Sequence, residues 1–169
     1  MSGRTLLWYS VLCGTGVIWS SVLVVALALG HRPVHSVVAV GVAALLTVPG
    51  FAVGVTANRR AYMTRQPRRF WSLQSWVPPH VPVAAAVFAG ALLFGFWLSI
   101  VLAFVALDGS PEVRGGQYVL DDHSRIVVVS AETYERQMDH EQQISLSVLG
   151  AFAIGGCFLC YARATDHET

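Results

Sequence analysis

The sequence contains no lysine and little charge of either sign. All eleven basic residues are arginines, and charged residues make up 12% of the 169-residue chain, about half their share in a soluble domain. Hydrophobic residues account for 54%, and apolar runs longer than about eighteen residues recur, as in membrane-spanning helices. This composition excludes an ordinary soluble domain and indicates an integral membrane protein. The absence of lysine, together with abundant Ala, Val and Gly, favours a bacterial source with a GC-rich genome.

The apolar runs also lack ionisable side chains at their centres. Proton- and ion-coupled transporters and small four-span drug exporters mark their pathways with such groups. A haem buried in a helix bundle needs an axial ligand such as histidine. The sequence therefore disfavours a transporter and a haem protein, and it predicts no cofactor.

Four runs are long enough to cross a hydrocarbon core of about 30 Å. An alternative for the first run is a secretory signal cleaved after Ala26-Leu27-Ala28, but the run is longer than the apolar part of a signal, which favours a retained span. In the second run, Pro49 predicts a kink, and the Gly50 to Gly54 spacing predicts close approach of another helix. The predicted spans are residues 6–29, 36–56, 81–107 and 144–162.

The segment between the second and third spans, residues 57–80, is basic and aromatic and is predicted to be a loop. It has five arginines and no acidic residue, so the positive-inside rule places it in the cytoplasm. The chain is then a multi-pass protein of the bacterial cytoplasmic membrane with both termini cytoplasmic. One interpretation is that the arginines only set this topology, and another is that they also bind anionic lipid headgroups. A nucleic-acid partner is not predicted, because no reader module is present. They are Arg59, Arg60, Arg65, Arg68 and Arg69.

Residues 108–143, called the cap below, are acidic. Eight acidic residues and three arginines give this segment a net charge of −5, and its place between the last two spans makes it extracytoplasmic. Its first part, residues 109–116, contains three glycines and a proline and is expected to be an irregular connection. Two β-prone runs on either side of Asp121-Asp122-His123-Ser124 predict a β-hairpin over residues 117–129.

A long helix is predicted to follow the hairpin. Ser130 is a good N-cap, and Glu132 suits the positive end of the helix dipole. No Pro or Gly occurs between Ser130 and Gly150, which predicts one helix over residues 131–162 whose first turns project about 20 Å beyond the membrane. The predicted fold is therefore an all-α membrane protein: a four-transmembrane-helix bundle with a small extracytoplasmic β-hairpin and a projecting extension of the fourth helix.

The hairpin and helix start resemble a pattern in uncharacterised small multi-span bacterial membrane proteins. Those proteins have a Tyr-x-Leu strand, an Asn-His-Gly-type turn and a Val-Ser/Thr-x-x-x-Tyr helix start before the last span. This chain has Tyr118-Val119-Leu120 and Val129-Ser130 with Tyr134, but Asp122 and Ser124 stand where Asn and Gly make an easier turn. The resemblance implies no particular activity, and accessory or immunity roles have been suggested for proteins of this general kind.

The cap is the candidate site of function. One alternative is a divalent metal held by Asp121, His123, Asp139 and His140, because zinc needs three or four converging ligands. Another is a membrane enzyme that uses His123 or His140 beside Asp139 or Glu141 as an acid-base pair, although no nucleophile is evident. The predicted interaction residues are Tyr118, Asp121, Asp122, His123, Tyr134, Met138, His140 and Glu141.

The fourth span contains a CxxC motif, Cys157-Phe158-Leu159-Cys160. It resembles the motif of four-helix quinone-linked thiol oxidoreductases, the vitamin K epoxide reductase and DsbB families, which implies redox chemistry. Those enzymes place the motif near the oxidising face and use further loop cysteines. Here it lies near the predicted cytoplasmic end, and the remaining cysteine, Cys13, is in the first span, so apolar packing is favoured.

The sequence thus predicts a non-enzymatic accessory, regulatory or immunity-type protein. Its partners are the lipid bilayer and a membrane protein or further copies of itself. The enzyme at the cap and the thiol oxidoreductase stay as alternatives.

Overall fold

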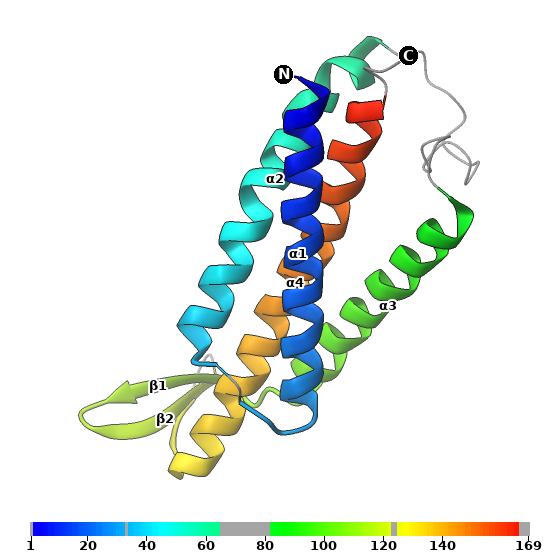
Figure 1. Cartoon of the computed structure of the whole chain (residues 1–169). Helices are drawn as coiled ribbons and strands as arrows, with labels where there is room; N and C mark the ends of the chain where they lie inside the picture. Colours follow the sequence, from blue (N-terminus) through cyan, green and yellow to red (C-terminus); the bar gives the residue numbers. More distant parts are fainter. Residues whose placement is uncertain (1, 33, 65–81, 123–124, 166–169) are drawn as a thin grey trace.

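The structure, a computed structural model, describes residues 2–32, 34–64, 82–122 and 125–165. Figure 1 shows long helices side by side and a small sheet that projects sideways at one end. The helices are α1 (Gly3–Ala28), α2 (Ser36–Thr64), α3 (Val83–Val105) and α4 (Ala131–Thr165). The strands are β1 (Ser110–Arg114), β2 (Gln117–Asp122) and β3 (Arg125–Val128).

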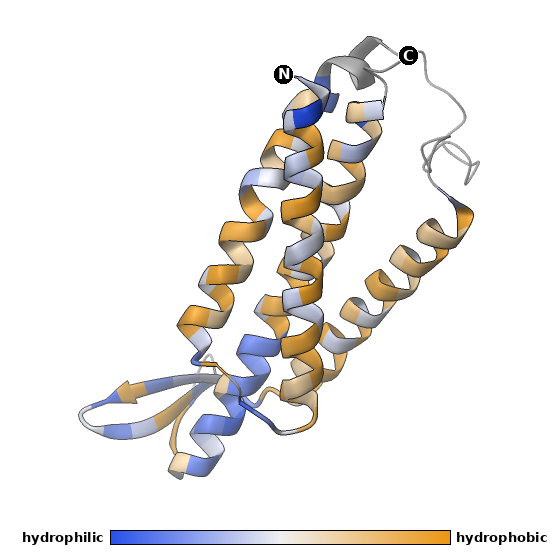
Figure 2. Ribbon diagram, viewed as in Figure 1, coloured by the Kyte–Doolittle hydropathy of each residue, from blue (hydrophilic) through white to orange (hydrophobic). Residues whose placement is uncertain are grey.

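All four helices are long and apolar enough to cross a membrane. Figure 2 shows apolar residues along the helices, many of them exposed, whereas hydrophilic residues gather in the sheet and in the first turns of α4. Helices that expose apolar surface on their outer sides are suited to lipid rather than water. The four predicted spans are confirmed as helices, and the chain has the make-up of a multi-pass membrane protein.

The other three helices all pack against α4. α1 and α2 also contact each other, as expected from the short connection between them. Close packing occurs at glycines: a Cβ at Gly150 would lie 2.4 Å from Cζ of Phe96, and one at Gly54 would lie 2.9 Å from Cβ of Leu159. Figure 1 shows α3 leaning away from the other helices at the end far from the sheet.

Two helices extend beyond the predicted spans. α4 is continuous from Ala131 to Thr165, and the hydroxyl of Ser130 accepts a hydrogen bond from the amide of Thr133 at 3.2 Å, which confirms both the unbroken helix and its N-cap. α2 continues to Thr64, so the first part of the segment predicted as a loop is helical. Residues 57–64 contain neither Pro nor Gly, and nothing local ends the helix there.

The predicted hairpin is present as β2 and β3, but a third strand precedes it. β1 pairs antiparallel with β2 in the order β1-β2-β3, which corrects the expected irregular connection over residues 109–116. Gly115 and Gly116 have φ values of 58° and 80°, as the two central residues of a tight type I′ hairpin turn require. Pro111 lies in an edge strand, which is where a sheet tolerates proline.

Candidate functional site

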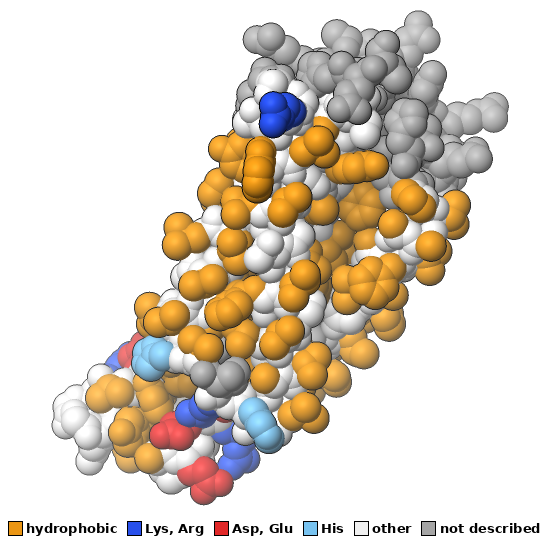
Figure 3. Space-filling view, viewed as in Figure 1, with side chains coloured by type: hydrophobic (Ala, Val, Ile, Leu, Met, Phe, Trp, Pro, Cys, Tyr) orange, Lys and Arg blue, Asp and Glu red, His pale blue; other side chains and the backbone are white. Residues whose placement is uncertain are grey.

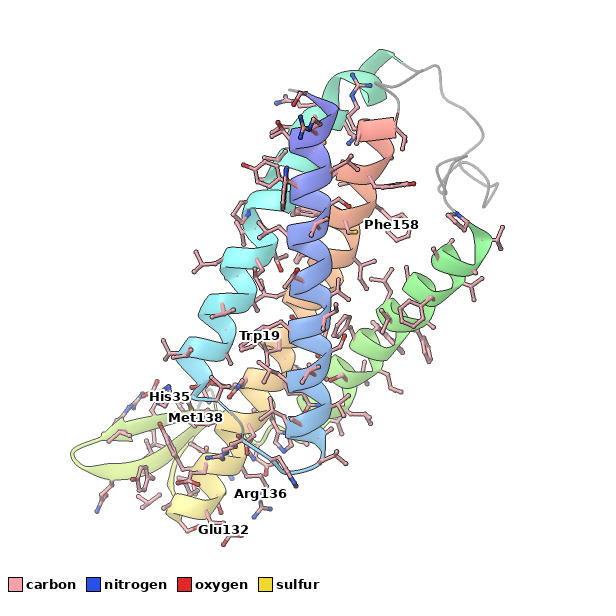
Figure 4. All side chains as sticks on the ribbon, in the orientation of Figure 1. Trp19, His35, Glu132, Arg136, Met138 and Phe158 are labelled. Atoms are coloured by element: carbon pink, nitrogen blue, oxygen red, sulfur yellow. The ribbon has the colours of Figure 1, made fainter. Side chains whose placement is uncertain are left out.

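The sheet is fixed to α4 by side chains from both elements. The rings of Tyr118 and Tyr134 lie 4.7 Å apart, centroid to centroid, at an angle of 34°. The hydroxyl of Ser110 donates to Oε1 of Glu141 at 3.3 Å. In Figure 4, Met138 lies on this side of α4, whereas Glu132 and Arg136 lie on the side away from the sheet. The hairpin therefore packs on the start of α4, as expected for a small sheet that is marginal alone.

The connection from α3 to the sheet is held by a buried glutamine. Gln137 is only 2% exposed. Its Oε1 accepts from the backbone amide of Asp108 at 3.1 Å, and its Nε2 donates to the carbonyl of Ala106 at 3.4 Å. Because a buried amide without partners would be costly, these bonds fix the path of the chain between α3 and β1.

The turn between α1 and α2 is tied to another side of α4. Arg32 Nε lies 2.5 Å from a carboxylate oxygen of Asp139, and its NH1 lies 3.1 Å from Glu135. Glu135 and Asp139 are one helical turn apart and so share a face. Arg32 therefore fixes the start of α4 at Glu135 and Asp139. The predicted projection of this helix is thus in contact with the α1–α2 turn and is not free along its whole length.

Arg114 links two acidic residues on the sheet. Its Nε lies 2.7 Å from Glu112 and its NH2 lies 2.8 Å from Asp121. The hydrogen bond that Arg114 donates to Glu112, aided by the charges of both carboxylates, raises the pKa of Arg114 above its ordinary value. Asp121, a predicted interaction and metal-binding residue, is thus engaged in an ion pair.

The consecutive polar residues of α4 point in different directions. Asp139 meets Arg32, whereas Glu141 meets Ser110, because successive side chains on a helix are about 100° apart. Nδ1 of His140 is buried and has no hydrogen-bond partner. Among the described residues, no group of three or more His, Cys, Asp and Glu side chains could hold a metal ion.

Several predicted residues fall outside what the structure describes. His123 lies outside the described ranges, as do Arg65, Arg68 and Arg69. Asp122 ends β2 and Arg60 lies in α2, but their side chains are not described. Arg59 is exposed on α2, toward the end of the bundle opposite the sheet (Figure 1). Lipid binding by these arginines stays a prediction.

The structure brings together all three cysteines of the chain, which the sequence did not reveal. A Cβ at Gly50 would lie 2.3 Å from Sγ of Cys13, and Sγ of Cys160 donates to the carbonyl of Gly50 at 3.3 Å. Cys157 lies nearby on α4, 3.3 Å from the hydroxyl of Ser10. Cys13 and Cys160 are fully buried, and thiols in buried apolar surroundings are usually inert. The geometry is that of helix packing, and no spacing in the sequence links Cys13 to the CxxC motif.

The sheet exposes apolar side chains that the sequence did not single out, with Val113, Tyr118 and Val127 on one face and Ile126 and Val128 on the other. Only Val119 and Leu120 are buried among its hydrophobic residues, and exposure elsewhere ranges from 41% at Tyr118 to 61% at Val128. Figure 3 shows hydrophobic side chains on the sheet beside the charged side chains of the cap. The exposed hydrophobic residues, called the sheet patch below, are Val113, Tyr118, Ile126, Val127 and Val128.

Of these residues, sequence reasoning selected only Tyr118 for interaction. For Ile126, Val127 and Val128 the sequence signal was that they form a β-branched, uncharged run. A strand pattern does not show which of its residues a neighbouring element covers. Comparison with protein-family models, curated proteins and solved structures found no match to this chain.

Proposed function

We propose that this protein is a non-enzymatic membrane protein whose cap binds a protein partner in an accessory, regulatory or immunity-type role. The observation that carries the proposal is the sheet patch. Single exposed apolar residues are ordinary on protein surfaces, but several together on one small sheet are typical of an interaction site. A partner that covers these side chains removes their apolar surface from water, which favours binding.

The mounting of the sheet supports this role. Tyr134 and Gln137 hold the sheet and its connection to α3 on one face of α4, and Arg32 binds another face of the same helix. A surface that is ordered before binding loses less conformational entropy when its partner arrives. The helices, which have no ionisable group at their centres, then serve to position the cap at the membrane surface.

The orientation follows from charge. The arginines of residues 57–80 favour the cytoplasmic side, and the sheet lies at the other end of the bundle from the end of α2 (Figure 1). We therefore place the cap outside the bacterial cytoplasmic membrane and both termini in the cytoplasm. An enzyme at the cap has less support, because Asp139 and Glu141 face different partners.

Purification in a mild detergent from native membranes tests the proposal. We expect a stoichiometric partner to accompany the wild-type protein and to be lost in a Val113→Asp/Ile126→Asp variant, which places charge in the sheet patch. Trp8→Ala is the control, since Trp8 is an exposed apolar residue on α1 far from the sheet. A protein that runs as a monomer without associates, or a partner retained by the cap variant, would contradict the proposal.

A further inference from the structure

The two edges of the sheet differ in chemistry. β1 carries Pro111, Glu112 and Arg114, and proline and charge are what natural edge strands use to prevent pairing with another chain. β3, at the other edge, carries Ile126, Val127 and Val128 in succession. It has no proline, and its one charged residue is Arg125 at its first position. An edge left open in this way is a template for another strand.

The register shows which backbone groups of β3 face outward. The amide of Val129 donates to the carbonyl of Tyr118 at 2.9 Å, and Val127 is paired with Leu120. Because hydrogen-bonded and non-hydrogen-bonded pairs alternate along an antiparallel ladder, Val127 directs its amide and carbonyl toward β2. Ile126 and Val128 direct theirs away from the sheet. No described strand pairs with that edge.

We propose that β3 pairs antiparallel with β3 of a second copy of this chain, which joins the two sheets into one. The inference rests on the proposed function and names its partner. With Val127 opposite Val127 of the second copy, Ile126 of each chain lies opposite Val128 of the other as a hydrogen-bonded pair. All of these cross-strand pairs join β-branched side chains, a combination that stabilises sheets.

Two copies in one membrane place a geometric condition on this pairing. Antiparallel edge strands of identical chains are related by a two-fold axis perpendicular to the sheet, and chains inserted in the same direction need that axis along the membrane normal. Figure 1 shows β1 and β2 running across the helix axes, with the hairpin that they form projecting sideways at one end of the bundle. Pairing through β3 therefore requires the plane of the sheet at Val127 to lie across the membrane normal, and the cross-linking below is done in the membrane so that it tests this condition.

Charge at the ends of β3 favours a second copy over an unrelated strand. Arg125 begins the strand, and Glu132, whose side chain is 88% exposed, lies in the first turn of α4 shortly after the strand ends. Antiparallel pairing brings the start of each strand beside the end of the other. Arg125 of each copy then approaches the acidic helix start of the other, and such complementarity selects the partner.

Disulfide cross-linking of the full-length protein in its membrane tests the pairing. The native cysteines are replaced by alanine, and Val127→Cys is introduced. Residues opposite each other in a non-hydrogen-bonded pair have Cα atoms about 4.5 Å apart, which a disulfide can span. We expect mild oxidation to give a covalent dimer with Val127→Cys. Val113→Cys is the matched control, an exposed valine of the same sheet on the protected edge, and should stay monomeric.

Substitutions in β3 then separate edge pairing from simple proximity. Ile126→Pro removes an outward amide and Ile126→Lys adds an edge charge while keeping the backbone, so both should weaken the dimer about tenfold or more in phosphatidylcholine–phosphatidylglycerol vesicles. Ile126→Thr keeps the amide and the β-branched side chain and should leave the strength of the dimer nearly unchanged. Dimer fraction is measured by energy transfer between labelled copies.

The outcomes distinguish the inference from the proposed function. Equal cross-linking at Val113 and Val127, or a dimer insensitive to Ile126→Lys, would overturn pairing through β3. A monomer that still holds a different protein through the sheet patch would overturn the second copy as partner and leave the proposed function standing. The absence of both a dimer and another partner would overturn both.

Discussion

At the scale of single residues, glycines set the distances between helices. Gly150 of α4 faces the ring of Phe96 on α3, which is itself buried. Gly50 of α2 faces the sulfur of Cys13 on α1. In lipid, where water does not drive helices together, close backbone approach of this kind supplies much of the attraction. A methyl group at either glycine would occupy space already filled.

Gly150→Ala should therefore destabilise the bundle. The new Cβ would lie well inside contact distance of Phe96, and overpacking of this kind costs about 1–3 kcal/mol. Thermal unfolding in detergent should show a lower Tm. Gly95→Ala on α3 is the control, because nothing lies within 4 Å of its added Cβ; it should be neutral or stabilising by up to about 1 kcal/mol. Equal losses in the two variants would contradict this account.

At the scale of elements, α4 joins the membrane helices to the cap. Its apolar part packs with α1, α2 and α3, and its first turns contact β1 and β2. An aromatic contact holds β2, a buried amide holds the connection between α3 and β1, and ion pairs hold the turn between α1 and α2. Tyr134 and Gln137 lie on one face of the helix and Glu135 with Asp139 on another, but each contact uses a different side chain of α4, so the contacts can be disrupted one at a time.

Tyr134→Ala should loosen the sheet without affecting the helices. The Tyr118 and Tyr134 rings are in contact, and such a pair contributes about 0.5–1.5 kcal/mol beyond its area. Hydrogen exchange should accelerate in β2, by up to about tenfold, while the amides at the centre of α4 keep their protection. Tyr134→Phe retains the ring and should behave as wild type. Unchanged exchange in the alanine variant would show that the sheet is held by other contacts.

Arg32→Gln should release the α1–α2 turn from α4. Its ion pairs with Glu135 and Asp139 are partly exposed, so their loss should cost only about 0.5–1 kcal/mol after solvent screening. High salt should therefore lower the free energy of unfolding of the wild-type protein by this amount, whereas the variant should show no such loss. Arg136→Gln is the control, since Arg136 lies 3.7 Å from Glu132 in an exposed pair. The same salt dependence in all three proteins would argue against the Arg32 contacts.

At the scale of the whole molecule, hydrophilic and apolar surfaces are separated along the bundle (Figures 2 and 3). The sheet and the start of α4 lie at one end, and the exposed Arg59 of α2 belongs to the basic segment at the other. If that basic segment is cytoplasmic, the sheet patch is available only to partners outside.

Cysteine labelling of intact cells checks this orientation. In a variant whose native cysteines are replaced by alanine, Val113→Cys should react with a membrane-impermeant maleimide, because Val113 is exposed on the sheet. Arg59→Cys should react only after the cells are opened. The reverse pattern would place the cap in the cytoplasm and would remove the basis for an extracytoplasmic partner.

The sequence alone determined the features that depend on local composition. Four apolar runs, the unbroken helix after Ser130 and the hairpin of β2 and β3 were all predictable, since run length, helix breakers and capping residues act over a few neighbouring positions. Strand β1, which was not predicted, had a local signal in the glycine pair Gly115-Gly116, with the β-prone Val113 and Tyr118 two positions away on either side. Pro111 and the charges around it concealed the strand.

Only the tertiary structure decided what those elements present to one another and to solvent. It brought Cys13 to Cys160, directed Asp139 and Glu141 to different neighbours, and left Ile126 to Val128 uncovered. Each of these results depends on which distant segment packs beside a residue, and no periodicity within one segment carries that information. The candidate site is therefore a property of packing, because burial of Val119 and Leu120 and exposure of their neighbours follow from where α4 meets the sheet.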